Sequence, residues 1–278
     1  MKILVTGANG YLGQGVVKKL LDCGIDVVAT DFSVDNVDPR AVLIAGDIFN
    51  TENPYEFFDK PDVVLHMAWR DGFVHYSDAH ILDLPKHYSF LNRCIDSGIR
   101  RLAVIGTMHE IGFYEGSIKE DTPCNPITPY GISKNALRQL VIMMSKKKGV
   151  SYQWLRGYYI VGNTSCGNSI FSKIVSAEKK GQETFPFTMG QNQYDFVDYE
   201  VFCRQVAAAV MQDQINGTIN ICSGKPEKLA DRVEAFIKEN NFDIRLQYGA
   251  YPDREYDSKA VWGDSQKINM IMENMVKK

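Results

Sequence analysis

The first 31 residues carry the pattern that most restricts how this chain can fold. Residues 2–6 form a short apolar run with β-branched members, which predicts a buried strand. A glycine-rich turn at residues 7–13 follows, and the next segment has apolar side chains at helical spacing until Gly24 ends it. Residues 25–30 predict a second buried strand, with Asp31 at its end. A strand, a glycine turn, a helix and a second strand in this register predict a parallel α/β sheet.

The glycines of this turn lie where a bound pyrophosphate would need them. Gly7 permits the tight turn, Gly10 lets backbone N–H groups approach the phosphates, and Gly13 allows the helix to pack closely on the strand. The phosphates would lie at the N-terminus of the helix, where the dipole favours negative charge. Glycine turns also occur in α/β proteins that bind no phosphate, but the register of all these features favours a dinucleotide. The cofactor contacts predicted in the turn are Gly7, Asn9, Gly10, Tyr11, Leu12 and Gly13.

Asp31 indicates which dinucleotide is bound. A carboxylate at the end of the second strand can accept hydrogen bonds from the adenosine ribose diol. The same carboxylate would repel a 2′-phosphate, and no Arg or Lys follows before Arg40. The sequence therefore predicts NAD(H) rather than NADP(H).

Composition and charge narrow the class of protein. The chain has 278 residues, 45% of them hydrophobic and 23% charged, which is ordinary for a globular protein with a large core. A net charge of −3 gives no case for nucleic acid or an anionic membrane surface as partner. No apolar run reaches the ~18 residues of a membrane span, and Lys2 leads directly into a core strand rather than a signal peptide. We therefore expect a cytoplasmic protein.

The cysteines predict neither a metal centre nor a disulfide framework. They form no C-x-x-C pair and have no metal-ligand spacing, so free thiols in a reducing compartment are the simplest interpretation. The six are Cys23, Cys94, Cys124, Cys166, Cys203 and Cys222.

Strands and helices alternate beyond Asp31, which predicts a Rossmann-type, doubly wound parallel sheet. Past Gly162 the elements become shorter, and no linker or repeat appears, so we expect a smaller substrate-binding lobe interleaved with the first domain. We assign residues 1–160 to the dinucleotide-binding domain with the catalytic residues, and residues 161–278 mainly to this lobe. The elements expected after Asp31 span residues 41–44, 61–69, 80–97, 101–107, 130–147, 152–156, 201–212, 217–222 and 227–240.

Three polar side chains are candidates for catalysis. Thr107 ends a strand, and an open parallel sheet binds its ligands beyond the carboxyl ends of its strands. Tyr130 and Lys134 stand four residues apart at the start of a helix, so their side chains share one face. A lysine beside a phenol, with a cationic nicotinamide nearby, would lower the phenol pKa from ~10 towards neutrality. Tyr130 would then be the general acid/base of a carbinol–ketone interconversion, with Thr107 holding the same oxygen. The Tyr-x-x-x-Lys spacing alone is common on amphipathic helices. Here it follows Thr107 in a chain that begins with a glycine turn, and this combination favours a catalytic role.

These segments together resemble the extended short-chain dehydrogenase/reductases of the NAD-dependent epimerase/dehydratase family, which act on nucleotide sugars. The resemblance covers nearly the whole chain. It implies that Asp47 and Ile48 contact the adenine, that Arg254 meets the substrate pyrophosphate, and that a further segment lies along the cofactor, namely Met67, Ala68 and Trp69. The segments that carry it are residues 7–13 with Asp31, 47–48, 65–69, 106–112, 120–123, 129–134, 195–198, 220–224 and 254–257.

Departures from the family pattern favour one branch of it. Met108 and His109 stand where the 4,6-dehydratases carry Asp-Glu, so a dehydratase is disfavoured. Tyr159 occupies the place of a phosphate-contacting Asn in many 4-epimerases, which favours a ketoreductase on 4-keto-6-deoxyhexoses. Asp31 weakly favours an epimerase instead, because epimerases keep NAD⁺ bound whereas many such reductases prefer NADPH. Ile111 stands where the family commonly has Tyr, and we interpret it as a packing residue.

The substrate contacts that we predict are Trp69, Met108, His109, Tyr159 and Arg254. Each has an ordinary alternative: His109 could face solvent, the loop after Trp69 could be a plain surface loop, and Arg254 could pair with a neighbouring acid. His66 is expected to be a packed, hydrogen-bonded core residue rather than a catalyst.

Together these features predict an NAD(H)-dependent oxidoreductase that reduces the 4-keto group of a nucleotide-linked sugar. A nucleotide-sugar 4-epimerase with tightly bound NAD⁺ is the alternative, and a non-catalytic NAD(P)-sensing protein is a third. The helices at residues 80–97 and 130–147 carry more apolar residues than one sheet face needs, so we expect a homodimer.

Overall fold

A seven-stranded parallel sheet forms the centre of the computed structural model, which describes residues 1–165, 167, 169–252 and 258–276. Every neighbouring pair in this sheet runs parallel, and the order reverses at β1, as in a doubly wound fold. The predicted fold class is therefore confirmed. Across the sheet the strands are β11 (Gly217–Ile221), β7 (Ser151–Gly157), β5 (Arg101–Thr107), β4 (Val63–His66), β1 (Lys2–Thr6), β2 (Asp26–Asp31) and β3 (Val42–Ala45).

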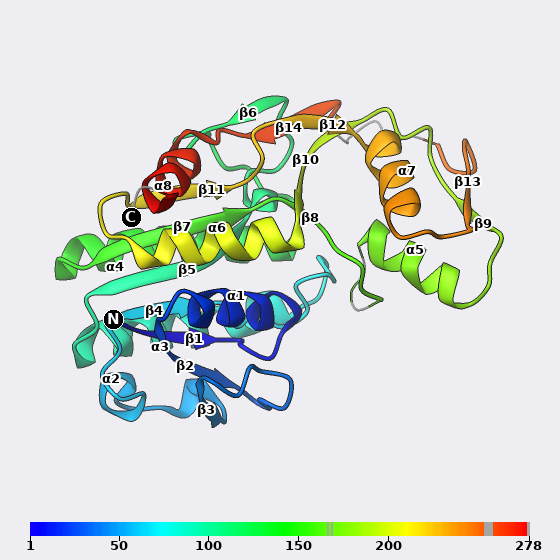
Figure 1. Cartoon of the computed structure of the whole chain (residues 1–278). Helices are drawn as coiled ribbons and strands as arrows, with labels where there is room; N and C mark the ends of the chain where they lie inside the picture. The colour runs from blue at the N-terminus through cyan, green and yellow to red at the C-terminus, as the bar shows by residue number, and fades with distance from the viewer. Residues whose placement is uncertain (166, 168, 253–257, 277–278) are drawn as a thin grey trace.

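Helices cover both faces of this sheet (Figure 1). Its central strands are buried on both sides, so their sequences read as continuous apolar runs rather than alternating ones. One face packs on α1 (Tyr11–Asp22), α6 (Tyr199–Met211) and α8 (Gln266–Val276), and the other on α3 (Ala79–Ser97) and α4 (Pro129–Lys148), with the short α2 (Pro54–Phe57) beside α3.

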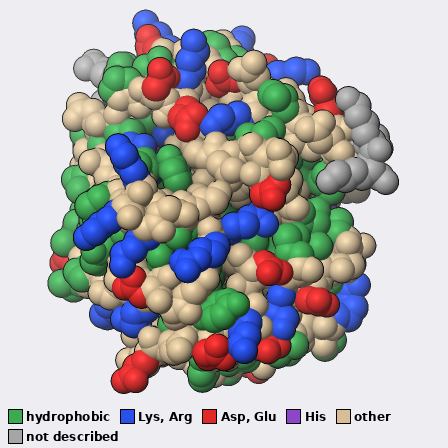
Figure 2. Space-filling model, turned by 90° about the vertical axis from the view of Figure 1, so that its left-hand side faces the viewer, with side chains coloured by type: hydrophobic (Ala, Val, Ile, Leu, Met, Phe, Trp, Pro, Cys, Tyr) green, Lys and Arg blue, Asp and Glu red, His purple; other side chains and the backbone are tan. Residues whose placement is uncertain are grey.

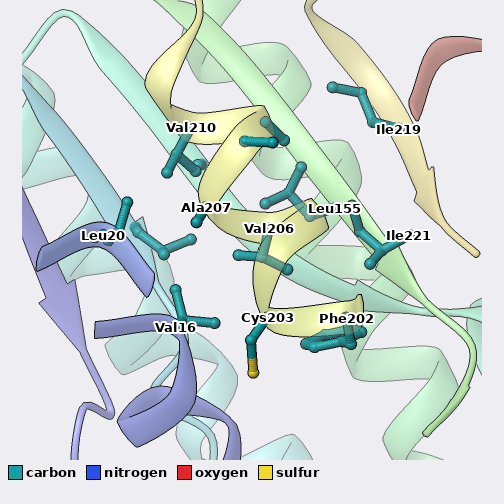
Figure 3. Close-up of a cluster of buried hydrophobic side chains, with 14 of the residues drawn as sticks. Val16, Leu20, Leu155, Phe202, Cys203, Val206, Ala207, Val210, Ile219 and Ile221 are labelled. Carbon is teal, nitrogen blue, oxygen red and sulfur yellow. The ribbon is translucent and has the colours of Figure 1, made fainter. Parts of the chain in front are cut away.

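The contact between α1 and α6 shows how the first face is filled. Val16 and Leu20 of α1 point towards the small and branched side chains of α6, including Val206 and Ala207 (Figure 3). Leu155 of β7 lies beneath them. All of these side chains are essentially inaccessible to water, and such burial stabilises the fold by roughly 25 cal/mol per Å² of apolar surface.

The start of α4 is fixed by local sequence, which places the predicted catalytic pair, Tyr130 and Lys134. Thr128 is the N-cap, and its hydroxyl accepts a hydrogen bond from the Gly131 N–H at 3.2 Å. Pro129 occupies the first turn, where its missing N–H costs nothing. The helix ends at Gly149, whose φ of 66° is the left-handed conformation of a glycine C-cap. Tyr130 and Lys134 therefore face the sheet from the first turns of α4.

A smaller lobe extends from the carboxyl ends of the large sheet (Figure 1). Its core is made by two helices, two short strands and the aromatic residues between them. A second sheet of order β12-β10-β14-β6, with β8 paired to β10, joins this lobe to the main body. The elements are β6 (Gly116–Ile118), β8 (Tyr159–Val161), α5 (Ile170–Lys179), β9 (Thr184–Pro186), β10 (Gln193–Asp198), β12 (Pro226–Lys228), α7 (Leu229–Glu239), β13 (Arg245–Gln247) and β14 (Ala260–Gly263).

Asp195 of β10 ties three segments of the chain together. Its carboxylate is fully buried and accepts hydrogen bonds from the N–H groups of Ser223, Gly224 and Gly263 at 2.7, 2.9 and 3.1 Å. Because α6 and β11 return to the large sheet between the first two of these segments, and α8 returns to it after the third, the chain crosses repeatedly between the two parts.

The surface carries charges of both signs. On the face seen in Figure 2, Lys and Arg side chains lie among Asp and Glu rather than in one patch. Within the residues that the structure describes, no helix is long and apolar enough to cross a membrane.

Candidate active site

The glycine turn is packed so closely that side chains could not replace its glycines. Gly7 has a φ of +69°, and a Cβ there would lie 2.6 Å from the Ala68 nitrogen. A Cβ on Gly13 would lie 2.2 Å from the Gly7 carbonyl oxygen. Gly10 is the N-cap of α1 and makes no side-chain cap, so the helix N-terminus remains open to an anion. These features fit the pyrophosphate of a dinucleotide.

Asp31 is fixed at the edge of this turn. One carboxylate oxygen accepts from the Asn9 N–H at 3.1 Å and the other from the Phe32 N–H at 2.8 Å. The Asn9 side chain in turn accepts from the Asn36 N–H at 2.9 Å, which holds the loop after β2 against the turn. Asp31 therefore lies beside the helix N-terminus, as a ribose-binding carboxylate would.

A cavity of about 600 Å³ lies beyond the carboxyl ends of β2 and β3, and its lining includes Thr30, the residue before Asp31. Asp47 and Ile48, the predicted adenine contacts, line it. The Asp47 carboxylate caps the short helix η1 (Ile48–Asn50) by accepting from the Phe49 N–H at 2.9 Å. The lining also contains apolar side chains, which suits an adenine ring.

Thr107, Tyr130 and Lys134 meet beyond the carboxyl end of β5. The Thr107 hydroxyl accepts from the His109 N–H at 3.3 Å, and Tyr130 stands at the start of α4. Burial raises the pKa of Tyr130 to about 12; a hydrogen bond with Thr107 opposes this shift, and the charge of Glu110 adds to it. The structure thus brings the three predicted catalytic residues together, with the phenol protonated at neutral pH.

Lys134 is 4% exposed, and its ammonium donates to the Ile105 carbonyl oxygen at 2.9 Å. Burial lowers its pKa to about 7, and the Glu110 carboxylate offsets part of that shift. That Lys134, with a cationic nicotinamide nearby, lowers the Tyr130 pKa stays a prediction; in the protein alone, burial raises that pKa. The loss of hydration is the main cause of the pKa shift of both groups, and the ammonium hydrogen-bonds a main-chain carbonyl rather than the phenol.

All five histidines of the chain gather around this site. The His75 ring stacks on Tyr130 with a centroid distance of 5.1 Å and an interplanar angle of 9°, and the Tyr130 N–H donates to the His75 carbonyl oxygen at 3.1 Å. His109 lies 4.4 Å from His75 between ring centroids. Burial lowers the pKa of His109 to about 3, so this ring is neutral at physiological pH. His109 therefore packs beside the phenol rather than facing solvent.

The comparison with known families agrees with this geometry. The sequence matches the model of the NAD dependent epimerase/dehydratase family over residues 3–222. The chain belongs to this family. Its predicted resemblance to the extended short-chain dehydrogenase/reductases that act on nucleotide sugars is thereby confirmed.

The similar proteins include nucleotide-sugar 4-dehydrogenases and 4-epimerases. The chain is 43% identical over 271 residues to a dTDP-6-deoxy-L-talose 4-dehydrogenase (NAD(+)) of Aggregatibacter actinomycetemcomitans, over 95% of this chain and 99% of that protein. It is 30% identical to a UDP-glucose 4-epimerase of Lactobacillus helveticus, over 98% and 91% of the two chains. Its fold is similar, with a TM-score of 0.84 at 19% identity, to a UDP-N-acetylglucosamine 4-epimerase from Methanobrevibacter ruminantium M1, over 97% and 91% of the two chains.

Within this family fold, the predicted substrate contacts have different surroundings. Tyr159 is half-buried between His109 and Tyr194, with ring centroids 6.1 and 4.7 Å away, so it lines the same aromatic cluster. Met108 is 7% exposed and belongs to the main hydrophobic core, which favours packing over substrate contact. Arg254 lies outside the described residues.

The remaining expectations concern packing. Ile111 is 1% exposed, which agrees with a packing residue. His66 is buried and hydrogen-bonded to Thr6 at 2.8 Å, as expected of a core histidine. The Thr6 hydroxyl also accepts from the Met67 and Ala68 N–H groups, both at 3.3 Å, and so holds the predicted cofactor segment against β1.

Sequence reasoning missed a buried ion pair beneath the predicted catalytic residues. The Glu110 carboxylate, with no exposed surface, accepts from Arg156 Nε at 2.7 Å and from Trp154 Nε1 at 2.8 Å. Its charge raises the pKa of both Tyr130 and Lys134. The available signal was an arginine inside the apolar run of β7, since a buried arginine needs an acidic partner.

A second cavity, of about 490 Å³, lies in the smaller lobe. Aromatic rings from two segments of the chain and one lysine are part of its lining. Its lining residues are Ile170, Lys173, Phe185, Pro186, Phe187, Thr188, Leu229 and Tyr251.

Proposed function

We propose that this protein reduces the 4-keto group of a nucleotide-linked 6-deoxyhexose with NADH, and catalyses the reverse oxidation with NAD⁺. The observation that carries this proposal is the meeting of Thr107, Tyr130 and Lys134 beyond β5, beside a glycine turn that fits a pyrophosphate. The 43% identical relative, a 4-dehydrogenase of dTDP-6-deoxy-L-talose, supports the same position of attack on the sugar.

The chain's own residues manage the proton of this reaction. NADH, when bound, supplies the hydride that reaches C4. The phenol of Tyr130, protonated at neutral pH, donates its proton to the oxygen that forms on C4. The hydroxyl of Thr107 donates a second hydrogen bond to that oxygen and fixes its direction. The Lys134 ammonium then stabilises the phenolate until a proton returns.

We propose that residues 161–278 mainly bind the nucleotide. The cavity of about 490 Å³ in the smaller lobe supports this, because Phe185 and Tyr251 present ring surfaces on which a base can stack. Lys173 lies in the same lining and would attract a phosphate. Lys173→Met should therefore raise the KM for the sugar nucleotide and leave the affinity for NADH unchanged.

A 4-epimerase is the second candidate, supported by the 30% identical relative. In that reaction the same three residues would oxidise C4 and then return the hydride to the opposite face. The two reactions differ in their need for added cofactor, because an epimerase regenerates its own NAD⁺. Tyr159 beside His109 supports the reductase, because it replaces an amide expected in many epimerases.

The decisive experiment supplies purified protein with dTDP-4-keto-6-deoxyhexoses, with and without NADH, and identifies the products by mass spectrometry and NMR. A product two mass units heavier than the ketone, with one NADH oxidised per molecule, is expected. Conversion of UDP-glucose to UDP-galactose without net cofactor change would favour the epimerase. Absence of any reaction across the set would overturn both proposals.

We also propose a homodimer formed through α3 and α4. These helices pack on each other, and each leaves large apolar side chains exposed: Leu82 is 67% exposed on α3, and Met143 is 49% exposed on α4. Ile81 and Ile132, 47% and 44% exposed, lie on the same two helices. Pairing across a two-fold axis would bury these side chains. Light scattering at micromolar concentration should give twice the mass of the chain; a stable monomer would exclude this arrangement.

A further inference from the structure

Lys134 lacks the partner that a buried ammonium normally has. Within the described residues it forms no salt bridge, since Glu110 is bonded to Arg156 and Trp154. In the described part of the chain, its one hydrogen-bond acceptor is the Ile105 carbonyl oxygen at 2.9 Å. An almost fully buried cation with one neutral acceptor needs a further source of stabilisation.

The indole ring of Trp69 supplies a surface for this cation. The Lys134 Nζ lies 3.8 Å from the centroid of the ring, within the range of a cation–π interaction. Trp gives the strongest such interaction among the aromatic side chains, and the effect grows when water is excluded. The residue that the sequence marked as a cofactor or substrate contact therefore lies against the catalytic lysine.

Two histidines of α3 hold the indole in place. The ring stacks on His87 with a centroid distance of 4.5 Å and an interplanar angle of 16°. Its N–H donates to His80 Nδ1 at 3.0 Å. The other nitrogen of His80 lies 2.9 Å from the Val74 carbonyl oxygen, which can only accept a hydrogen bond. His80 Nε2 therefore carries the proton, and Nδ1 is free to accept from the indole.

The neighbouring imidazoles are neutral and cannot repel the lysine. His66 Nε2 and His87 Nδ1 lie 2.9 Å apart in a buried hydrogen bond. Burial lowers the pKa of His66, and it lowers that of His87 to about 3; the charge of Lys134 acts in the same direction on both. The titratable groups around Lys134 are then the neutral His66 and His87, His80 behind the indole, the phenol of Tyr130 and the carboxylate of Glu110.

We propose that Trp69 is a positioning residue that holds the Lys134 ammonium charged and in place through a cation–π contact, with His80 and His87 fixing the indole. The inference rests on the proposed function in so far as Lys134 is taken to be catalytic. Loss of the ring surface should favour the neutral amine, so the Lys134 pKa should fall. The pH range in which a charged Lys134 can stabilise the Tyr130 phenolate should then narrow.

The test reads Lys134 directly. Protein labelled with ¹³C at lysine Cε is titrated by NMR, and the Lys134 signal is assigned by its absence in Lys134→Met. In Trp69→Leu the midpoint should fall by about one pH unit, a tenfold change in proton affinity, and in Trp69→Phe by roughly half that. Phe49→Leu is the matched control, because Phe49 touches His87 edge-on at 4.9 Å without reaching the lysine, and its midpoint should equal that of wild type.

A midpoint in both Trp69 variants equal to that of wild type would overturn the proposal. If Trp69→Leu fails to fold, as judged by circular dichroism, Trp69→Phe alone decides. The pH dependence of NADH binding, measured by calorimetry without sugar, should shift with the same midpoint. Neither readout needs turnover. A protein inactive on every sugar tested would therefore refute the proposed function, whereas the Lys134 titration would still decide this inference.

Discussion

The two ends of the dinucleotide cleft are built on different principles. At the glycine turn, backbone meets backbone: Gly7 and Gly13 lie so near Ala68 and the Gly7 carbonyl oxygen that a single added carbon would collide. At the catalytic end, side chains meet side chains, and the rings of Trp69, His75 and Tyr130 determine the geometry. The glycine turn tolerates no change of shape, whereas the chemistry at the other end depends on which groups carry protons.

The difference shows how each end can be damaged. Steric contacts at the turn cannot relax without moving a strand or a helix, so substitutions there should act on stability and cofactor binding together. The catalytic end can keep its shape when one oxygen is removed, and should then lose only its chemistry.

Tyr130→Phe should give the largest effect and separates the two ends most clearly. It removes the proton donor but keeps the ring that stacks on His75, so turnover should fall by ~10²–10⁴ while the melting temperature and the NADH affinity are retained. Steady-state kinetics and thermal melts measure both quantities. Tyr152→Phe, the same change at a half-buried tyrosine of β7, should leave turnover unaltered. Near-normal turnover in Tyr130→Phe would show that the proton comes from elsewhere.

Glu110→Gln tests whether the catalytic end also depends on a charge beneath it. Arg156 would be left buried without a counter-ion, which should cost about 3–5 kcal/mol of unfolding free energy. Denaturant titrations would measure this loss. The matched change Glu56→Gln affects an exposed pair with Lys60 and should fall within ~0.5 kcal/mol of wild type. Equal stability of both variants would mean that Arg156 finds another partner.

Gly13→Ala probes the steric end. The new methyl group would meet the Gly7 oxygen and Ala8 at 2.2–2.8 Å, and neither can move as a flexible side chain could. We expect a loss of about 1–3 kcal/mol of unfolding free energy together with weaker NADH binding. Gly72→Ala, where nothing lies within 4 Å, is the control and should change neither. An unaltered NADH affinity in Gly13→Ala would argue against the pyrophosphate site.

Asp31→Ala should have the smallest effect and sharpens the cofactor assignment. Removing the carboxylate relieves its repulsion of a 2′-phosphate and loses a ribose contact, so the preference for NADH over NADPH should narrow by roughly tenfold. Calorimetry with both cofactors measures this ratio, and Asp26→Ala at the exposed start of β2 should leave it unchanged. Tighter binding of NADPH than NADH by wild type would contradict the assignment.

The sequence predicted the regions of the molecule that depend on local pattern. The glycine turn, the strand that ends at Thr107, and the helix that begins at Tyr130 all follow from periodicity and capping residues a few positions apart. The helices at 80–97 and 130–147 were expected within a residue of their observed ends.

What the sequence did not predict depends on contacts between distant segments. The strands β6 and β14 are short and pair with partners far along the chain, so no local pattern marks them. The gathering of the histidines was equally hidden, because His75, His80 and His109 reach one site only through the packing of two helices and a loop. The upward shift of the Tyr130 pKa in the protein alone was not predicted either, because burial cannot be read from a spacing of four residues.

The interleaving of the two parts has a consequence for synthesis on the ribosome. The edge strand β11 and the helix α8 that covers it come from the last quarter of the chain, yet they complete the sheet that begins with β1. Until residues 217–221 have emerged, β7 presents an unpaired edge with open N–H and C=O groups, a template for pairing with other chains. The dinucleotide-binding sheet therefore cannot mature co-translationally from its N-terminal part alone, and a nascent chain stalled before β11 should depend on chaperones to avoid aggregation.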